Sequence, residues 1–447
     1  MGFLTGSVSR SGKPFGTPLL RNSIFLLLRT FVNHGMGFLF WLAVARLYLP
    51  ADVGIAAVFL TTTLLLARAA ALGLPLGILR FLPAHRDKVG LINAAFTVSS
   101  ISSIALGVTF FAGLDVWAPA LASVRRDPLL LTALFVSLVF FTLDGVLDNS
   151  FVAARRADYG LARTTIFYGL RLPLVFAFAS LGVLGIALSW TTALVVSVLG
   201  TAPLLSRFFP GYRPAIAVRS LRGTGIFGFS LWSYGTGLVA GASDSLLPLL
   251  ILQRLGADAG ATIAAYYFAA SALAGLLDAV PQSFSTSLLV EGSYLGTNFV
   301  AATRKTVRYS APILALGIAG AILLGRPLLS LFGPSYAAES YGTLVALAFA
   351  SPIMLAVGIV TASLRIAKRV RPIFAITSVS AGVTLTVAWL TIPLLGALGA
   401  ASGAIAGQAT SLTLRFFVVR RGVPGAAGAP ASQPSAPDPP QGQMRNA

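Results

Sequence analysis

Residues 54–79 read GIAAVFLTTTLLLARAAALGLPLGIL, a run of 26 residues in which Arg68 is the only charged side chain. A helix needs roughly 20 mainly apolar residues, at about 1.5 Å each, to cross about 30 Å of hydrocarbon. The run is therefore long and apolar enough to span a membrane. Because lipid offers the backbone no hydrogen-bond partners, such a span must be helical.

The same character extends over the whole chain of 447 residues. Hydrophobic residues make up 56% of it and charged residues 10%, glycine adds 45 residues, and the mean hydropathy is +0.85. Soluble domains are roughly 45–50% apolar even with glycine counted, and about 25% charged. The composition therefore excludes a soluble, disordered or collagen-like protein, and the absence of cysteine excludes a disulfide scaffold.

Windows of spanning length predict twelve transmembrane helices, and the predicted fold class is an all-α polytopic membrane protein. The windows lie at residues 23–47, 54–79, 90–112, 129–151, 160–180, 184–206, 226–250, 262–287, 306–330, 341–364, 372–393 and 397–419. The residues before the first window carry no cleavable signal pattern. We therefore expect the first span to act as an uncleaved insertion signal.

Basic residues alternate sharply between the two sides of these spans. Of the 32 Lys and Arg residues we assign 24 to the side of the N-terminus, Arg163 and Arg415 among them, and five to the opposite side. The other three, Arg29, Arg68 and Arg171, fall within spans. By the positive-inside rule, this predicts a multi-pass protein of the inner (cytoplasmic) membrane with both termini cytoplasmic. The net charge of +19 thus reports topology, and we expect no nucleic-acid partner.

The spans and loops predict five segments. Residues 1–21 form a cytoplasmic N-terminal segment, 22–206 an N-lobe of six helices, 207–225 a cytoplasmic loop, 226–419 a C-lobe of six helices, and 420–447 a tail. The tail is rich in Gly, Ala, Pro, Ser and Gln, so it cannot bury apolar area and is predicted to be disordered.

The two lobes share short sequence matches in the same order. RLYLPADVG (46–54) corresponds to RLGADAG (254–260), and GVLGIA (182–187) to GALGAA (396–401). Chance matches between Gly- and Ala-rich helices are the alternative to a duplication. An even number of spans gives both repeats one orientation, so they are parallel repeats around a central cavity. This is the architecture of an alternating-access transporter.

Spans one and seven contain polar and helix-weakening residues at corresponding positions. Span one carries Asn33, His34 and two glycines at 35–37, and residues 241–248 of span seven include Gly, Ser, Asp and Pro. Paired interruptions of this kind point to a substrate site, although glycine also permits close helix packing. His34 is a candidate proton carrier, or else simply hydrogen-bonds the backbone.

Arg29 and Arg68 are the charged residues of the first two spans. With Asn33 and His34, they are predicted to line the cavity and to bind a phosphate or diphosphate, whose oxygens a guanidinium fork matches. Arg29 lies near the cytoplasmic end of its span, so its side chain can instead reach the membrane surface.

The equivalent C-lobe spans carry carboxylates, Asp244 and Asp278. We expect one of them to pair with Arg29 or Arg68 in one conformation and to release it to substrate in another. A permanent ion pair is the alternative.

Spans four and five carry three more charges within the membrane. Asp144 and Asp148 share a helix face, and Asp144 and Arg171 come to similar depths. These residues predict a structural ion pair between Asp144 and Arg171, with a proton- or Na⁺-coupling site as the alternative.

Four segments resemble polysaccharide-repeat (O-antigen-type) flippases, the oligosaccharidyl-lipid branch of the multidrug/oligosaccharidyl-lipid/polysaccharide exporter superfamily. They are ARLYLPADVGIA (45–56), AALGLPLGILRFLP (70–83), LFGPSY (331–336) and LRIAKR (364–369). The resemblance covers most of residues 20–420. It implies two six-helix lobes around a cavity open to one side at a time.

The resemblance further implies that a polyprenyl-diphosphate-linked oligosaccharide moves from the inner to the outer leaflet for assembly of cell-surface polysaccharide. The implied partners are this lipid-linked substrate, membrane lipid, H⁺ or Na⁺ as coupling ion, and polysaccharide polymerase or assembly proteins. The family has no catalytic motif to transfer. The three Arg and four Asp within spans depart from the strongly cationic cavity expected of some relatives.

Two other functions compete with a flippase. A multidrug exporter of organic cations belongs to the same superfamily and needs a carboxylate in its N-lobe cavity, where Asp144 is available. A membrane enzyme needs a large outer loop, whereas the longest outer connection is residues 113–128, with no HExxH, GxSxG or Walker A motif. We therefore expect no enzyme activity, no catalytic residue, no cofactor and no metal site.

Overall fold

The computed structural model describes residues 18–117, 119, 121, 127–221, 226–292, 299–367 and 369–422. In this part of the chain the regular elements are all helices. Residues 1–17 and 423–447, which include most of the predicted N-terminal segment and tail, lie outside the described residues.

The first half of the chain supplies the helices of the first six predicted spans. They are α1 (Pro18–Leu47), α2 (Pro50–Ala70) with α3 (Leu74–Phe81), α4 (Lys88–Ala112), α6 (Pro128–Ala153), α7 (Ala157–Ala177) and α8 (Val183–Thr201), and the short α5 (Leu114–Trp117) follows α4. We call this set of helices the N-lobe.

The second half supplies the other six, and we call them the C-lobe. They are α9 (Ile226–Leu255), α10 (Ala257–Gly292), α11 (Phe299–Ser330), α13 (Tyr341–Ile366), α14 (Val370–Leu395) and α15 (Ala397–Gly422), with the short α12 (Pro334–Glu339) before α13.

Among the described residues, nine helices are long and apolar enough to cross a membrane. The remaining three predicted spans correspond to α1, α7 and α15. α7 carries Arg163 and Arg171, and α15 carries several small polar residues and Arg415. In α7 and α15, these polar and charged side chains lower the hydropathy and are the first sign that the two helices face polar surroundings within the protein.

The predicted interruptions of spans one and seven are wrong, since α1 and α9 run unbroken through those residues. The break lies in span two, where Leu72 (φ 51°) and Gly73 (φ 75°) are left-handed and separate α2 from α3. Pro75 lies in the first turn of α3, where its missing N–H costs nothing. In α9, Gly241 instead provides room, because a Cβ there would lie 2.7 Å from Nη1 of Arg68.

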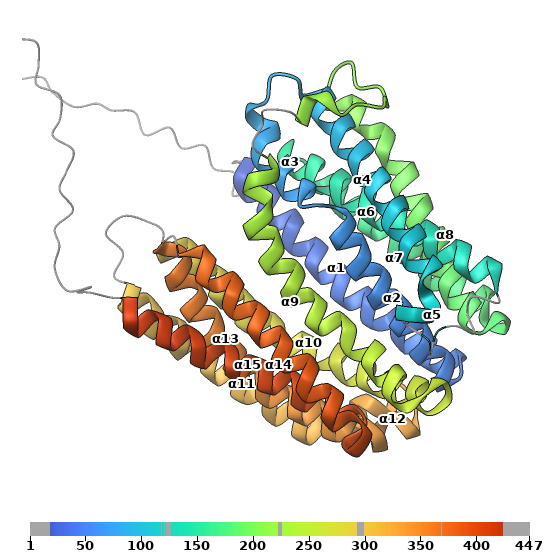
Figure 1. The fold of residues 1–447 in the computed structure, drawn as a ribbon, viewed down its shortest axis with the longest axis vertical. Coiled ribbons are helices and arrows are strands. Elements are labelled where there is room, and N and C mark those ends of the chain that lie inside the picture. The colour runs from blue at the N-terminus through green and yellow to red at the C-terminus, as the bar shows by residue number, and fades with distance from the viewer. Residues whose placement is uncertain are drawn as a thin grey trace, which may run out of the picture.

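The two lobes lie side by side, with the N-lobe in blue to green and the C-lobe in yellow to red (Figure 1). The start of α1 and the end of α15 lie on the same side of the molecule, which we call the terminal end. The α1–α2 and α9–α10 turns lie at the opposite, distal end. α2 packs against both α9 and α10, and this contact forms the seam between the lobes.

At the distal end the lobes are in direct contact. A Cβ on Gly54 of α2 would lie 1.7 Å from the carbonyl oxygen of Ala261 in α10, so the two backbones touch. The ring of Trp41 lies 4.3 Å from that of Phe268, centre to centre. The guanidinium of Arg46 donates to the backbone oxygen of Ser330 at 2.9 Å, at the end of α11. The distal end is therefore closed.

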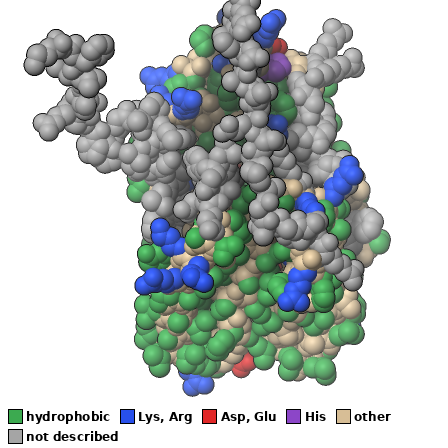
Figure 2. All heavy atoms as spheres, turned by 90° about the vertical axis from the view of Figure 1, so that its left-hand side faces the viewer, with side chains coloured by type: hydrophobic (Ala, Val, Ile, Leu, Met, Phe, Trp, Pro, Cys, Tyr) green, Lys and Arg blue, Asp and Glu red, His purple; other side chains and the backbone are tan. Residues whose placement is uncertain are grey.

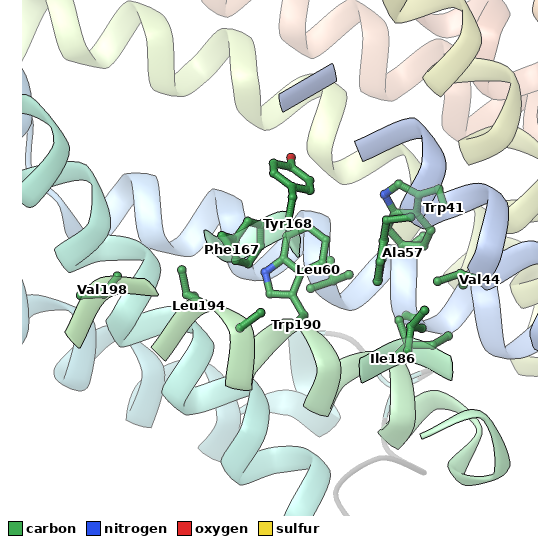
Figure 3. Close-up of a cluster of buried hydrophobic side chains, with 14 of the residues drawn as sticks. Trp41, Val44, Ala57, Leu60, Phe167, Tyr168, Ile186, Trp190, Leu194 and Val198 are labelled. Atoms are coloured by element: carbon green, nitrogen blue, oxygen red, sulfur yellow. The ribbon is translucent and has the colours of Figure 1, made fainter. Parts of the chain in front are cut away.

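The interior of the N-lobe is filled by large apolar side chains. Figure 3 shows Trp41 of α1, Leu60 of α2, Phe167 of α7 and Trp190 of α8 converging on one cluster. This packing fixes α7 and α8 against α1, and so fixes the charged side chains that α7 carries.

Candidate functional site

Four charged side chains from α1, α6 and α7 form a cluster inside the N-lobe, the N-lobe charge cluster. Arg29 pairs with Asp148, and Arg163 pairs with Asp144 and lies 3.5 Å from Asp148 between Nη2 and Oδ1. The Nε of Arg29 also donates to the Thr164 hydroxyl at 3.2 Å. Two cations face two carboxylates, so the cluster is neutral.

The predicted ion pair between Asp144 and Arg171 is wrong, because Arg163 takes the place of Arg171. Arg163 is only 4% exposed, well inside α7, and not in the cytoplasmic loop region to which its sequence position assigned it. At 1.5 Å per residue it lies about 9 Å beyond the start of the helix. This depth brings it level with Asp144.

Arg171 is instead enclosed by aromatic rings. Its Cζ lies 3.7 Å from the ring centre of Phe40, 4.1 Å from that of Trp190, 4.5 Å from that of Tyr168 and 4.9 Å from that of Phe167. The aromatic faces attract the cation. Within the described residues, its Nε and Nη1 have no hydrogen-bond partner. We call this arrangement the aromatic cage.

The predicted cavity residues of span one are not brought together with Arg68. Arg29 belongs to the charge cluster, and Oδ1 of Asn33 accepts a hydrogen bond from the Tyr168 hydroxyl at 2.8 Å. The side chain of His34 lies outside the described residues. Whether these residues also contact substrate stays a prediction.

Arg68 lines a cavity of about 290 Å³ between the lobes, the seam cavity. Its walls come from α2, α3, α6 and α9 and include Pro75, Asp144 and Tyr234. The Arg68 side chain is exposed to it and crosses to the backbone of Gly241. In the described part of the chain, no carboxylate lies within ion-pair distance of Arg68, although Asp244 is close enough to interact electrostatically.

A larger cavity of about 490 Å³ lies inside the C-lobe, the C-lobe cavity. Five helices line it, α9, α10, α13, α14 and α15. Asp244 lies toward the distal end of the lining, and Arg365 and Arg415 lie near the terminal end of the molecule.

The sequence assigned Arg365 and Arg415 to the cytoplasmic side and so missed this cavity. One signal was available, because Gly407, Ser411 and Arg415 recur every four residues and therefore share one face of α15. Figure 2 views the side of the molecule that includes the terminal end and shows several Lys and Arg side chains on it.

The second C-lobe carboxylate, Asp278, has a hydroxyl partner. The Ser351 hydroxyl of α13 donates to its Oδ1 at 2.7 Å. Neither Asp244 nor Asp278 forms an ion pair with Arg29 or Arg68 in the described residues. The exchange of partners predicted from the sequence is therefore absent from this conformation, and it stays a prediction for another.

No family model matches the sequence, and no curated protein matches it significantly. Solved structures do match. The inward closed conformation of the lipid II flippase MurJ has a TM-score of 0.72 at 13% identity, covering 89% of this chain and 87% of that one. An inward-facing multidrug resistance MATE transporter of the MOP superfamily has 0.65 at 15%, covering 90% and 98%.

The outward-facing conformation of a MATE transporter is similar too, with a TM-score of 0.58 at 18% identity, covering 90% of this chain and 95% of that one. These likenesses extend over nearly all the described helices and confirm the predicted all-α, two-repeat membrane fold. The chain thus has the twelve-helix, two-repeat fold of these MOP-superfamily transporters.

Proposed function

We propose that this protein is an alternating-access transporter that moves a polyprenyl-diphosphate-linked oligosaccharide from the cytoplasmic to the outer leaflet of the inner membrane. Its product would serve the assembly of cell-surface polysaccharide. The observation that carries the proposal is Arg68, a cation at membrane depth that faces the seam cavity and has no carboxylate within ion-pair distance among the described residues.

An unpaired arginine at this depth is unfavourable unless it has a ligand. Even on a lenient scale, placing one at the centre of a span costs about 2.5–3.5 kcal/mol. Arg29 and Arg163 avoid this cost through Asp148 and Asp144. Arg68 has only the longer-range interaction with Asp244 among the described residues and, as a planar fork of donors, suits the oxygens of a diphosphate.

The closed distal end supports a conformation that loads substrate from the terminal end. If the termini are cytoplasmic, as the basic residues predict, this conformation is inward-facing, in line with the inward closed MurJ structure and the inward-facing MATE structure to which it is similar. Separation of the lobes at Gly54 and Ala261 would then open the opposite side.

The carboxylates have proposed roles in gating and coupling. Asp244, which interacts electrostatically with Arg68, is the proposed carboxylate to receive Arg68 once substrate has left, and Asp278 interacts electrostatically with Asp244. We assign H⁺ or Na⁺ coupling to this pair. Asp144, Asp148 and Arg171 are proposed to keep the N-lobe rigid during the transition.

Multidrug extrusion is the second candidate. Its support is Asp244, a carboxylate exposed in the C-lobe cavity where an organic cation can bind, together with the MATE-like fold. It differs from the first proposal in the sign of the charge that the substrate carries.

Reconstitution in proteoliposomes separates the two proposals. A labelled polyprenyl-diphosphate disaccharide and a cationic dye are offered to wild type, Arg68→Gln and the matched control Arg86→Gln, an exposed loop arginine. We expect wild type and Arg86→Gln to move the glycolipid and Arg68→Gln to lose at least about tenfold in rate. Movement of the dye with a stationary glycolipid would overturn the flippase proposal.

A further inference from the structure

We propose that the C-lobe cavity is a second binding site, for a sugar diphosphate head group. Arg365 and Arg415 would hold the phosphates near the terminal end of the cavity, and hydroxyl and amide side chains farther along the lining would hold the sugar. The inference rests on the proposed function for the lipid that carries this head group, and it names where the head group docks.

Arg415 carries a buried positive charge that forms no ion pair with a described residue. It is 5% exposed, and its Nη2 donates to the Thr377 hydroxyl at 2.9 Å while Nη1 donates to Ser411. Both partners are neutral, so they orient the guanidinium without cancelling its charge. Within the described residues Nε has no partner at all. A buried cation that keeps a donor unused is arranged for an anionic ligand.

Arg365 brings a second positive charge to the same cavity. It is exposed, and it interacts electrostatically with Arg415. The two positive charges repel each other, and an anion bound between them would attract both guanidinium groups and offset this repulsion. A diphosphate offers two charged groups to two guanidinium forks.

The rest of the lining suits a polyhydroxyl compound. Its polar members are neutral and come from several helices, among them Gln282, Ser285, Thr361, Thr384 and Gln408. The hydroxyl of Ser285 is buried without a hydrogen-bond partner in the described part of the chain. A volume of about 490 Å³ lies within the usual range of small-molecule sites.

The charges of the cavity are separated along its length. On α9, the lining runs from Thr236 down to Asp244, about 12 Å at 1.5 Å per residue. On α13 it runs from Met354 up to Arg365, about 16 Å. The carboxylate is therefore at the opposite end of the lining from the two arginines, and a phosphate held by the arginines lies away from it.

The test is direct binding to the full-length protein in nanodiscs. Three probes share the phosphate chemistry: a polyprenyl-diphosphate disaccharide, a nucleoside diphosphate sugar, and inorganic diphosphate. The variants are Arg415→Gln, Arg365→Gln and the charge-preserving Arg415→Lys. Arg369→Gln, an exposed arginine outside the cavity lining, is the matched control.

We expect both glutamine variants to weaken binding of the glycolipid roughly ten- to hundredfold, the loss of one charge-assisted contact. Arg415→Lys should retain part of the affinity and Arg369→Gln all of it. Equal affinity for the nucleoside diphosphate sugar would assign the site to a water-soluble source. Much tighter binding of the glycolipid would assign it to the lipid-linked one.

Unchanged affinity for all three probes in both glutamine variants, each shown to be folded by gel filtration, would overturn the site. If Arg415→Gln does not fold, the exposed Arg365→Gln decides the matter. Normal binding by these variants, beside glycolipid transport by wild type, rejects the site and leaves the flippase standing. If a soluble sugar diphosphate binds in a way that depends on these arginines, while wild type transports only the dye, the site is retained and the flippase proposal is rejected.

Discussion

The N-lobe and the C-lobe are repeats of one six-helix unit, yet their interiors differ. In the N-lobe, the arginines of the charge cluster face carboxylates, and Arg171 lies in its aromatic cage. In the C-lobe, Arg415 faces only hydroxyls beside a cavity of about 490 Å³. The two lobes thus share a fold but differ inside. In the N-lobe, buried arginines are paired with carboxylates or packed against aromatic rings, and in the C-lobe a buried arginine lies beside a cavity that can hold a ligand.

The repeated motif at the outer turns shows the same divergence. Arg46 reaches across to the other lobe and donates to Ser330, whereas its counterpart Arg254 stays within the C-lobe, donating to the backbone oxygen of Trp389 at 3.2 Å. Gly54 touches Ala261 across the seam. Both repeats therefore contain the Arg and the Gly of this motif, but of these residues Arg46 and Gly54 of the N-lobe contact the other lobe, whereas Arg254 and Gly260 contact their own.

The largest expected effect is on the free energy of unfolding, and it separates an arginine that pairs with carboxylates from one that does not. Arg163→Gln leaves Asp144 and Asp148 with Arg29 alone, and breaking a buried ion pair costs about 3–5 kcal/mol. Arg415→Gln removes hydrogen bonds to hydroxyls only and should cost about 1 kcal/mol.

Thermal or denaturant unfolding of both variants in detergent measures this difference. The double variant Arg163→Gln with Asp144→Asn should recover part of the stability, because it removes the stranded carboxylate. Equal losses for Arg163→Gln and Arg415→Gln would show that the two lobes do not differ in this way.

An intermediate effect is expected at the paired glycines. Gly54→Ala places a methyl group against the backbone of Ala261, so it should cost about 1–3 kcal/mol or force the lobes apart at the distal end. Gly260→Ala meets only Ile251 and Leu252 of its own lobe, at 2.9–3.0 Å. Labelling of a cysteine placed at the distal seam should increase for Gly54→Ala alone; a similar increase for Gly260→Ala contradicts the asymmetry.

The smallest effect is expected in the aromatic cage. Arg171→Met fills the same space without a charge, so the lost cation–π attraction of about 2 kcal/mol is offset by the desolvation that methionine avoids. We expect a net change below about 1 kcal/mol in the free energy of unfolding. Arg171→Ala, which leaves a void, should cost about 2–5 kcal/mol. A large loss in Arg171→Met would mean that the charge itself is needed.

The sequence was sufficient for the number of spans and for their grouping, because hydropathy and basic residues repeat in each helix. The sequence could not predict whether an arginine is buried or exposed when the difference is a single turn of helix. Arg163 and Arg415 lie about 9–10 Å inside their helices, deep enough to be buried and shallow enough to be counted as loop charges.

The interruption of a helix was also misplaced, for a related reason. Glycine and proline weaken a helix in the same way whether it bends, breaks or packs closely. Gly241 accommodates Arg68, while Gly73 ends a helix with a positive φ of 75°. The role of each glycine depends on which helices pack against it, and the local sequence does not specify those tertiary neighbours.

The separation of charge along the C-lobe cavity has a consequence for selectivity. A head group bound in the proposed way would pass Arg365 and Arg415 first and would meet Asp244 only at the far end of the lining. A molecule whose negative groups sit at its lipid-proximal end fits this polarity, whereas one with an acidic sugar at its tip carries like charge toward the carboxylate. The cavity would therefore sort glycans by the position of their acidic residues, favouring chains whose leading sugars are neutral.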